Sequence, residues 1–231
     1  MATTFRASAN GTGNSTAPSA TKPTGTVDGD VVVWGVFALV AKTVTPPTGF
    51  ALVQEQTGPF GGKLSLYQKV AASDGASYGG TLSGTTQWIC FAVTFQGTSP
   101  GVEQSGSGSN GTAGSPNCVI PAMTTTKANS SICLFQWHES GFGATTWTPD
   151  ATTTERFDVM DGSATANVCC DTRDVTTAQS YGAWTVVNDV ANIGLNNGRY
   201  AKLVLSDNSA PVAGMIFPKP SRVAVRRAAS W

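Results

Sequence analysis

The sequence is poor in charged residues and has a single histidine. Asp, Glu, Lys and Arg make up 12% of the 231 residues, and 14 basic side chains balance 14 acidic ones. Without a basic excess, we expect no nucleic-acid-binding surface. Common Ser-His-Asp and Cys-His triads would all require the one histidine, His138. A surface rich in neutral Thr, Ser, Asn and Gly is easily buried against other subunits, which favours a homo-oligomer or an assembled particle.

Long apolar runs and paired cysteine motifs are also missing. The longest apolar run, 31–41, is about half of what a bilayer crossing requires, so we expect no membrane partner. The first six residues lack the basic and apolar regions of a secretory signal. The five cysteines show no CxxC spacing, and the adjacent Cys169 and Cys170 would point to opposite faces of a strand. We therefore predict reduced thiols, no metal site and no cofactor.

The chain consists mainly of short β-type segments. β-branched and aromatic residues recur between turns rich in Gly, Pro, Asn and Thr, and no window of about eleven residues has a convincing helical stripe. We predict an all-β, jelly-roll-like antiparallel β-sandwich, with 1–207 as one domain. The predicted strands are 3–8, 31–40, 50–56, 63–71, 87–96, 118–123, 131–138, 154–159, 165–171, 183–188 and 200–206.

Two halves, 30–97 and 131–207, show the same order of features at an offset of about one hundred residues. We interpret this as a duplication in which both halves contribute matched strands to both sheets. Two unrelated β-meanders with similar turn chemistry are the alternative. Segment 105–116, rich in Gly and Ser, is then a flexible connector, and 10–26 an exposed loop or loose crossover. The matched pairs are Val31–Ala38 with Ile132–Glu139, Thr45-Pro46 with Thr148-Pro149, Phe50–Gln54 with Thr153–Phe157, Tyr67–Val70 with Val168–Asp171, Ser77-Tyr78-Gly79 with Ser180-Tyr181-Gly182, and Trp88–Phe95 with Tyr200–Leu205.

The C-terminal segment 208–231 differs from the rest of the chain. Its three prolines oppose regular strand pairing, yet it carries apolar pairs and a basic cluster. We predict an extended arm that pairs with a sheet edge on another subunit, whereas the alternative is a frayed, solvated terminus. The candidate partner-binding residues are Ile216, Phe217, Arg222, Val223, Val225, Arg226, Arg227 and Trp231.

No pattern in the sequence predicts catalysis, so no catalytic residue is assigned and we expect a non-enzymatic protein. His138 ends a predicted strand, where an ordinary hydrogen bond is expected. Glu155, Asp171 and Asp174 would support glycosidase chemistry only if a pocket gathered them. We expect Asp171–Asp174 to form a charged loop beside Arg173.

Two further patterns suggest weaker binding sites. Asp28-Gly29-Asp30 is interpreted as a turn before the first central strand rather than a calcium loop. Exposed aromatic rings stack on sugars, and Trp147 and Trp184 lie next to Thr-rich turns. They are the candidates for a glycan platform.

Three segments together resemble a module of tailed-bacteriophage virion proteins: Gly29–Val33, Val44–Phe50 and Leu66–Ala71. Similar segments also occur in bacterial surface proteins. The resemblance covers 30–97 well and 131–207 faintly, and it implies a jelly-roll-like fold more than a specific role. It leads us to expect a virion structural protein, assembled in the host bacterial cytoplasm with other capsid or tail subunits. We favour a capsid cement or decoration protein; the alternatives are a tail or fibre component, or a carbohydrate- or receptor-binding module.

Overall fold

The computed structural model describes residues 2–97, 100–109, 116–139, 145–189 and 199–207. It confirms an all-β antiparallel fold, and these residues contain no helix. The strands of the first half are β1 (Thr4–Ser15), β2 (Ser19–Thr21), β3 (Val31–Ala38), β4 (Val44–Thr45), β5 (Ala51–Thr57), β6 (Lys63–Val70), β7 (Ser77–Gly79), β8 (Thr81–Leu82) and β9 (Thr86–Gln96). Those of the second half are β10 (Pro100–Ser109), β11 (Asn117–Ile120), β12 (Met123–Thr124), β13 (Ser130–Glu139), β14 (Trp147–Thr148), β15 (Thr154–Met160), β16 (Ala166–Val175), β17 (Ser180–Tyr181), β18 (Trp184–Asn188) and β19 (Arg199–Asp207).

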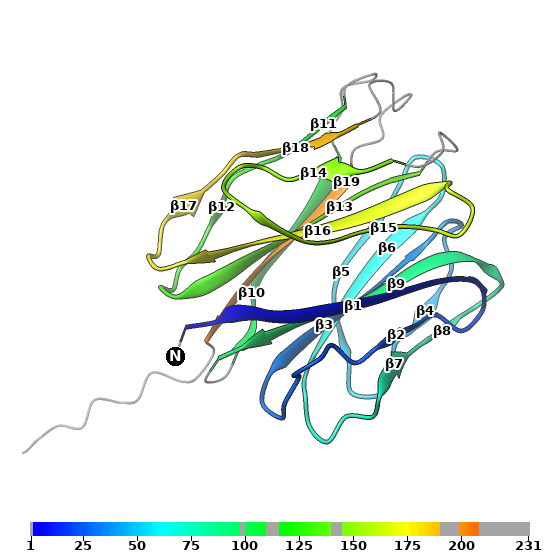
Figure 1. Cartoon of the computed structure of the whole chain (residues 1–231), viewed down its shortest axis with the longest axis horizontal. Coiled ribbons are helices and arrows are strands. Elements are labelled where there is room, and N and C mark those ends of the chain that lie inside the picture. Colours follow the sequence, from blue (N-terminus) through cyan, green and yellow to red (C-terminus); the bar gives the residue numbers. More distant parts are fainter. Residues whose placement is uncertain (1, 98–99, 110–115, 140–144, 190–198, 208–231) are drawn as a thin grey trace, which may run out of the picture.

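Each half forms one five-stranded sheet. The strand orders are β1-β9-β3-β6-β5 and β10-β19-β13-β16-β15, and in Figure 1 the second half occupies the upper part of the view. The prediction that the halves share strands in both sheets is therefore wrong. In each sheet the first strand of the half pairs with the last one, β1 with β9 and β10 with β19, so each sheet is closed by long-range pairing within its own half.

Short strands cover the outer face of each sheet. In the first half β2 pairs with β7 and β4 with β8; in the second, β12 pairs with β17 and β14 with β18, where β11 joins. The chain alternates between the large sheet and this outer layer, as in a jelly roll, but β5 and β15 pair within the large sheets. The jelly-roll topology therefore stays a prediction.

The two halves share their bulges as well as their strand order. The first strand of each half is bulged near its start, and β5 and β15 are each bulged once. Tyr67 and Asp171 hold matching places, because each pairs with the residue just before the β5 or β15 bulge. The predicted segment pairs thus fall on equivalent strands, although the match of Val70 with Asp171 is three residues out of register. The bulges lie between Phe5 and Ala7, Val102 and Gln104, Leu52 and Gln54, and Glu155 and Phe157.

The inner faces of the two sheets pack together into one shared core. Phe91 of β9 stacks on Phe135 of β13, with ring centroids 5.1 Å apart and an interplanar angle of 24°. Gly35 of β3 makes this possible, because a Cβ there would overlap the Phe91 ring. The outer faces hold separate cores, one with Trp34 beneath the outer layer of its half. Strands β3 and β9 are apolar at nearly every position because both their faces are buried.

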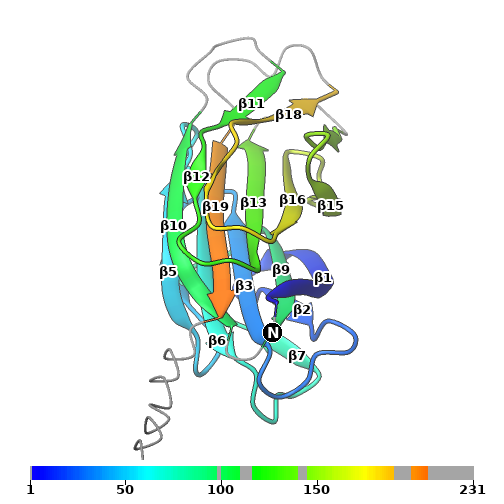
Figure 2. The ribbon, with the colours of Figure 1, turned by 90° about the vertical axis from the view of Figure 1, so that its left-hand side faces the viewer.

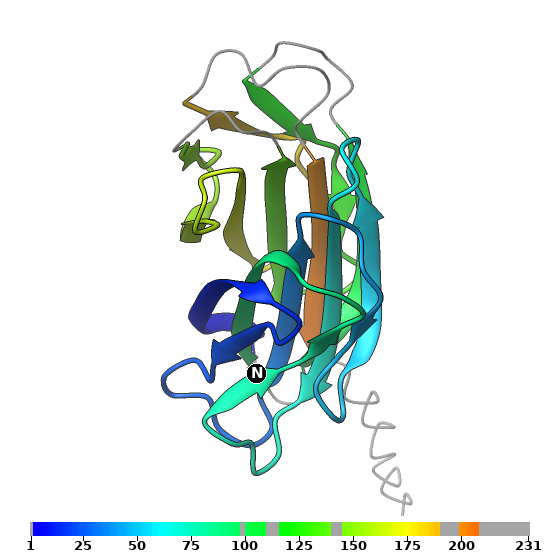
Figure 3. The same ribbon diagram turned by 90° about the vertical axis from the view of Figure 1, so that its right-hand side faces the viewer.

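Side chains close the two open sides of the sandwich. On one side β10 lies beside β5, where Ser107 Oγ donates to Gln56 Oε1 at 2.7 Å and accepts from Gln54 Nε2 at 2.9 Å (Figure 2). On the other, β1 lies beside β15 (Figure 3). There the Arg156 guanidinium lies 4.0 Å from the Phe5 ring centroid. Because β1 matches β10 and β5 matches β15, the two seams join corresponding strands of the two halves.

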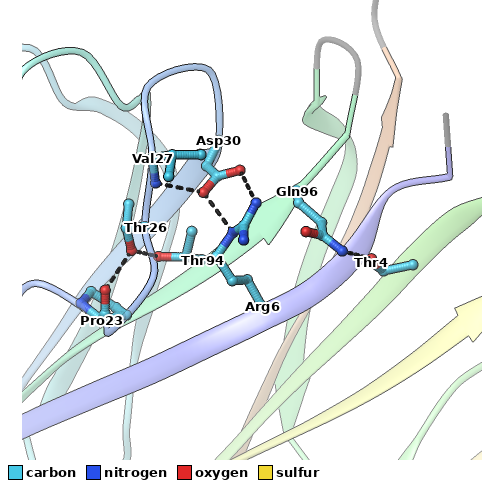
Figure 4. Close-up of polar contacts among 8 residues, drawn as sticks. All are labelled: Thr4, Arg6, Pro23, Thr26, Val27, Asp30, Thr94 and Gln96. Atoms are coloured by element: carbon cyan, nitrogen blue, oxygen red, sulfur yellow. Dashed lines mark hydrogen bonds and ion pairs between the residues drawn. The ribbon is translucent and has the colours of Figure 1, made fainter.

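An ion pair fixes the bulge of β1 to the turn before β3. Arg6 Nε lies 2.7 Å from Asp30 Oδ2, and Arg6 Nη2 donates to Asp30 Oδ1 at 3.1 Å (Figure 4). The same carboxylate accepts a hydrogen bond from the Val27 amide at 2.9 Å. The prediction of a turn at Asp28-Gly29-Asp30 is confirmed, and Arg6 and the backbone engage the Asp30 carboxylate.

Parts of the predicted loop 10–26 and of the predicted connector 105–116 are edge strands. Strand β1 runs to Ser15 and β10 to Ser109, so the predictions of a loop or crossover and of a flexible connector are wrong for 10–15 and 105–109. The glycines are needed because aromatic rings of the neighbouring strand lie over them. A Cβ on Gly13 would lie 2.6 Å from Trp88, and one on Gly108 would lie 2.7 Å from Tyr200 Cζ. This pairing of edge glycine with aromatic ring compensates for the missing side chain.

Replacing Gly35 by Ala is expected to destabilise the protein by about 1–3 kcal/mol, because the new methyl group must displace Phe91 from its stack on Phe135. Urea unfolding followed by tryptophan fluorescence measures the change. The control is Gly75→Ala, where a Cβ meets nothing within 4 Å. Equal stability of the two variants would contradict the packing described.

Candidate functional site

The two tryptophans predicted as a glycan platform lie in the core. Trp147 is 3% exposed and Trp184 is 1% exposed. Both pack under the outer layer of the second half with Tyr181 and Ile132. Stacking on a sugar requires an open ring face, so this prediction is wrong. The Thr-rich turns next to the two tryptophans suggested exposed rings, but these turns belong to the outer layer that covers the sheet.

The predicted C-terminal arm, with its partner-binding residues Ile216, Phe217, Arg222, Val223, Val225, Arg226, Arg227 and Trp231, lies outside the described residues. Its expected role stays a prediction.

A cluster of polar groups lies on the outer face of the second sheet, where β15 and β16 pair. Glu155 is opposite Asp171, and Asp158 is opposite Cys169. Cys169 and Asp171 are two residues apart on β16, so they share one face. The Cys169 Sγ lies 3.6 Å from Asp171 Oδ1. Glu155 is exposed, whereas Cys169 and Asp171 are fully buried.

Burial dominates the electrostatics of this cluster. The pKa of Asp171 is raised to about 7, first by burial and then by the negative charges of Glu155 and Asp158, against the lowering effect of a hydrogen bond from Cys169. Burial also raises the pKa of the Cys169 thiol, as do the carboxylates of Asp171, Asp158 and Glu155. Asp171 is therefore much more readily protonated than an exposed aspartate, and Cys169 stays a thiol.

Gln136 of β13 completes the cluster. It is fully buried and lies directly across the ladder from Cys169. Its side chain faces Asp171 and lowers the pKa of that carboxyl. Yet among the described residues neither its Nε2 nor its Oε1 reaches hydrogen-bonding geometry with a partner, and neither does Asp171 Oδ2. Unpaired buried polar atoms are costly, at about 1–3 kcal/mol each, so their gathering in one place is notable.

His138 lies next to the cluster and forms the ordinary hydrogen bond that was expected. Its Nε2 is bonded to Thr145 Oγ1, and the Thr145 carbonyl accepts from Asn167 Nδ2 at 2.7 Å. Burial lowers the pKa of His138 to about 4, although Asp161 and Asp189 act in the opposite direction. The imidazole is therefore neutral at physiological pH, which suits a packed position.

Of the three carboxylates considered for catalysis, the structure brings two together. Glu155 and Asp171 meet, whereas Asp174 lies apart at the end of β16, where it accepts a hydrogen bond from Ser131 Oγ at 2.8 Å. The predicted charged loop at Asp171–Asp174 is instead part of a strand, because β16 extends to Val175. The missed signal is the alternation of Asn167, Cys169 and Asp171, which puts three polar groups on one face.

The cluster belongs to the second half alone. The place of Asp171 is taken in the first half by Tyr67, which packs on Trp34 with ring centroids 5.6 Å apart. Trp34 pairs with Tyr67 as Leu134 pairs with Asp171, which makes Val36 the counterpart of Gln136. Where the first half has apolar and aromatic side chains, the second half has buried carboxyl, thiol and amide groups.

All five cysteines are free and buried. Cys133 and Cys170 face each other in the shared core with their sulfur atoms 3.5 Å apart, as thiols.

Among the described residues, no helix is long and apolar enough to cross a bilayer. No family model, curated protein or solved structure matches the chain.

Replacing Trp184 by Ala is expected to destabilise the protein by about 3–5 kcal/mol, because a fully buried indole would leave a cavity. Urea unfolding followed by far-UV circular dichroism measures the loss. Phe60→Ala is the matched control, since Phe60 is 58% exposed and its removal should change stability by less than about 0.5 kcal/mol. A Trp184→Ala variant as stable as the control would contradict the burial of this indole.

Proposed function

We propose that the chain is a non-enzymatic structural protein of a tailed-phage virion, most simply a decoration protein on the capsid. The proposal rests on the resemblance of three segments of the first half to virion modules. Its mechanism is mechanical: a rigid subunit that bridges neighbouring capsid subunits adds interface that must break before the particle expands or bursts.

The observation that carries the proposal is that the three resembling segments build one packing unit, in which Val32, Phe50 and Ala71 lie in the same core. Phe50 makes an edge contact with Tyr78, with centroids 5.5 Å apart, and packs against Trp34 at 6.2 Å. Lys69 lies 5.5 Å from the Phe50 ring centroid and forms an ion pair with Asp74. These residues hold the outer layer on the sheet. The motif thus has a structural task, as expected of a module shared by assembly proteins.

Exposed apolar side chains indicate a surface for such assembly. Leu52 on β5 is 57% exposed, Phe60 in the β5–β6 turn is 58% exposed, and Val70 at the end of β6 is 54% exposed. The edge of β5 itself is already closed by its hydrogen bonds to Ser107 of β10. The exposed apolar side chains are therefore the feature that a protein interface would cover.

Purified particles of the phage that encodes the chain test the proposal. We expect the protein in particles at a fixed copy number, with its density on the capsid surface in cryo-EM images. Density on the tail would place it among tail or fibre components instead. Its absence from particles would refute a virion role of any kind.

Two variants separate the surfaces that hold the protein on the particle. Leu52→Glu combined with Phe60→Ser puts charge and polarity on the β5–β6 hairpin, and deletion of 211–231 removes the predicted arm. We expect at least about a tenfold loss of bound copies for the hairpin variant, because a buried unpaired charge costs about 1.4 kcal/mol or more. The number of copies bound per particle is measured by quantitative gel analysis. If either variant binds at full copy number, the surface changed in that variant does not hold the protein on the particle.

A further inference from the structure

Three potential metal ligands meet on the outer face of the second sheet. The ligating atoms of Glu155, Cys169 and Asp171 all lie within 4.8 Å of one another. Pairing of β15 with β16 brings them together, although Glu155 lies well before the other two in the sequence. A search for closely spaced His and Cys residues in the sequence does not find such a set, because pairing between two strands brings its members together.

A second feature points to a ligand at the same place. Gln136 is 0% exposed and its amide interacts with Asp171 closely enough to lower the pKa of that carboxyl, yet neither amide atom reaches full hydrogen-bonding geometry with a partner within the described part of the chain. Its carbonyl oxygen could serve as a neutral fourth ligand. A metal ion between these groups would engage the Gln136 carbonyl and Asp171 Oδ2, and thereby remove the cost of leaving them unpaired.

The basic side chains nearest in sequence are engaged elsewhere. Arg156 lies over the Phe5 ring at the seam and donates from Nε to Thr172 Oγ1 at 2.6 Å. Arg173 lies over the ring of Tyr181, 5.1 Å from its centroid. Glu155, Asp158 and Asp171 together therefore lack a paired basic side chain among the described ion pairs. Such a site attracts a cation.

We propose that Glu155, Cys169 and Asp171 bind a divalent transition-metal ion, with Zn²⁺ the favoured species and the Gln136 carbonyl as the fourth ligand. A thiolate is a soft ligand, which disfavours Mg²⁺ and Ca²⁺. Tetrahedral Zn²⁺, with bonds of about 2.0–2.3 Å, needs ligand atoms about 3.3–3.8 Å apart. The cluster must therefore contract by about 1 Å, and the exposed Glu155 side chain is free to move inward.

Binding exchanges protons for the metal. Zn²⁺ displaces the thiol proton of Cys169 and any proton on Asp171, and these protons pass to solvent. Three negative ligands and one divalent ion leave a net charge of about −1 at the site. No electron transfer is involved. The bound ion would tie the edge strand β15 to β16, and this role does not depend on a virion function.

The full chain, unfolded and refolded with a phosphine reductant and Co²⁺ or Zn²⁺, tests the proposal. Co²⁺ serves as the spectroscopic probe, since a cobalt–thiolate bond gives an intense near-ultraviolet charge-transfer band. We expect one Co²⁺ per chain, displacement of the band by one equivalent of Zn²⁺, and a higher Tm with Zn²⁺ than with Mg²⁺.

Variants assign the ligands. Glu155→Gln keeps the size of an exposed side chain, so it should fold normally and bind Co²⁺ about tenfold or more weakly. Cys169→Ser should abolish the charge-transfer band. The controls are Asp174→Asn on the same strand and Cys118→Ser in the neighbouring core, and both should keep the band. The proposal is overturned if the wild-type chain shows no band, or if the band survives in Cys169→Ser, or if Glu155→Gln binds as tightly as wild type.

Discussion

The face-to-face packing of the two sheets, centred on Phe91 and Phe135, is the contact on which the rest of the structure depends. It makes the inner face of each sheet apolar, and the core of each half beneath the outer strands makes the other face apolar too. The molecule therefore has four layers, and its longest strands have few positions left for charges. The low charge of the sequence, 12% of residues, follows in part from this layering rather than from surface chemistry alone.

The strands that could be predicted from the sequence are the most apolar ones. Strands such as β3 and β9 were found because both faces are buried, so their sequences stand out. The Gly-rich parts of β1 and β10 were missed, since propensity treats glycine as a loop residue and cannot register the aromatic ring across the ladder. Strands of two or three residues, such as β4 and β17, carry too little sequence for any periodicity. The alternation of apolar and polar residues also could not show which strands share a sheet. The pattern is the same whether each half forms its own sheet or both halves contribute strands to both sheets.

The polar cluster shows the same limit for function. Period-2 alternation was visible at Asn167, Cys169 and Asp171, but Arg173 nearby suggested a solvated loop. The register that brings Glu155 to Asp171 depends on the β15 bulge, and a bulge cannot be located from one sequence. Comparison of the two halves would have helped once the bulges were known, since Tyr67 in the place of Asp171 marks the site as a departure from the shared plan. The first half is stabilised at this place by aromatic packing. The second half has buried polar groups there, which destabilise it unless they are hydrogen-bonded or bound to a ligand.

Because each half completes its own sheet, synthesis on the ribosome has an unusual intermediate. The first sheet is whole once β9 has emerged, yet its inner face, with Phe37, Leu66 and Phe91, has no cover until β13, β16 and β19 are made. At about 5–20 residues per second, the remaining hundred or so residues take roughly 5–20 seconds. During that time a nascent chain presents an uncovered apolar sheet face to its neighbours on the same polysome. The matching inner face of another copy's second half is a suitable partner, so exchange of halves between chains competes with correct closure.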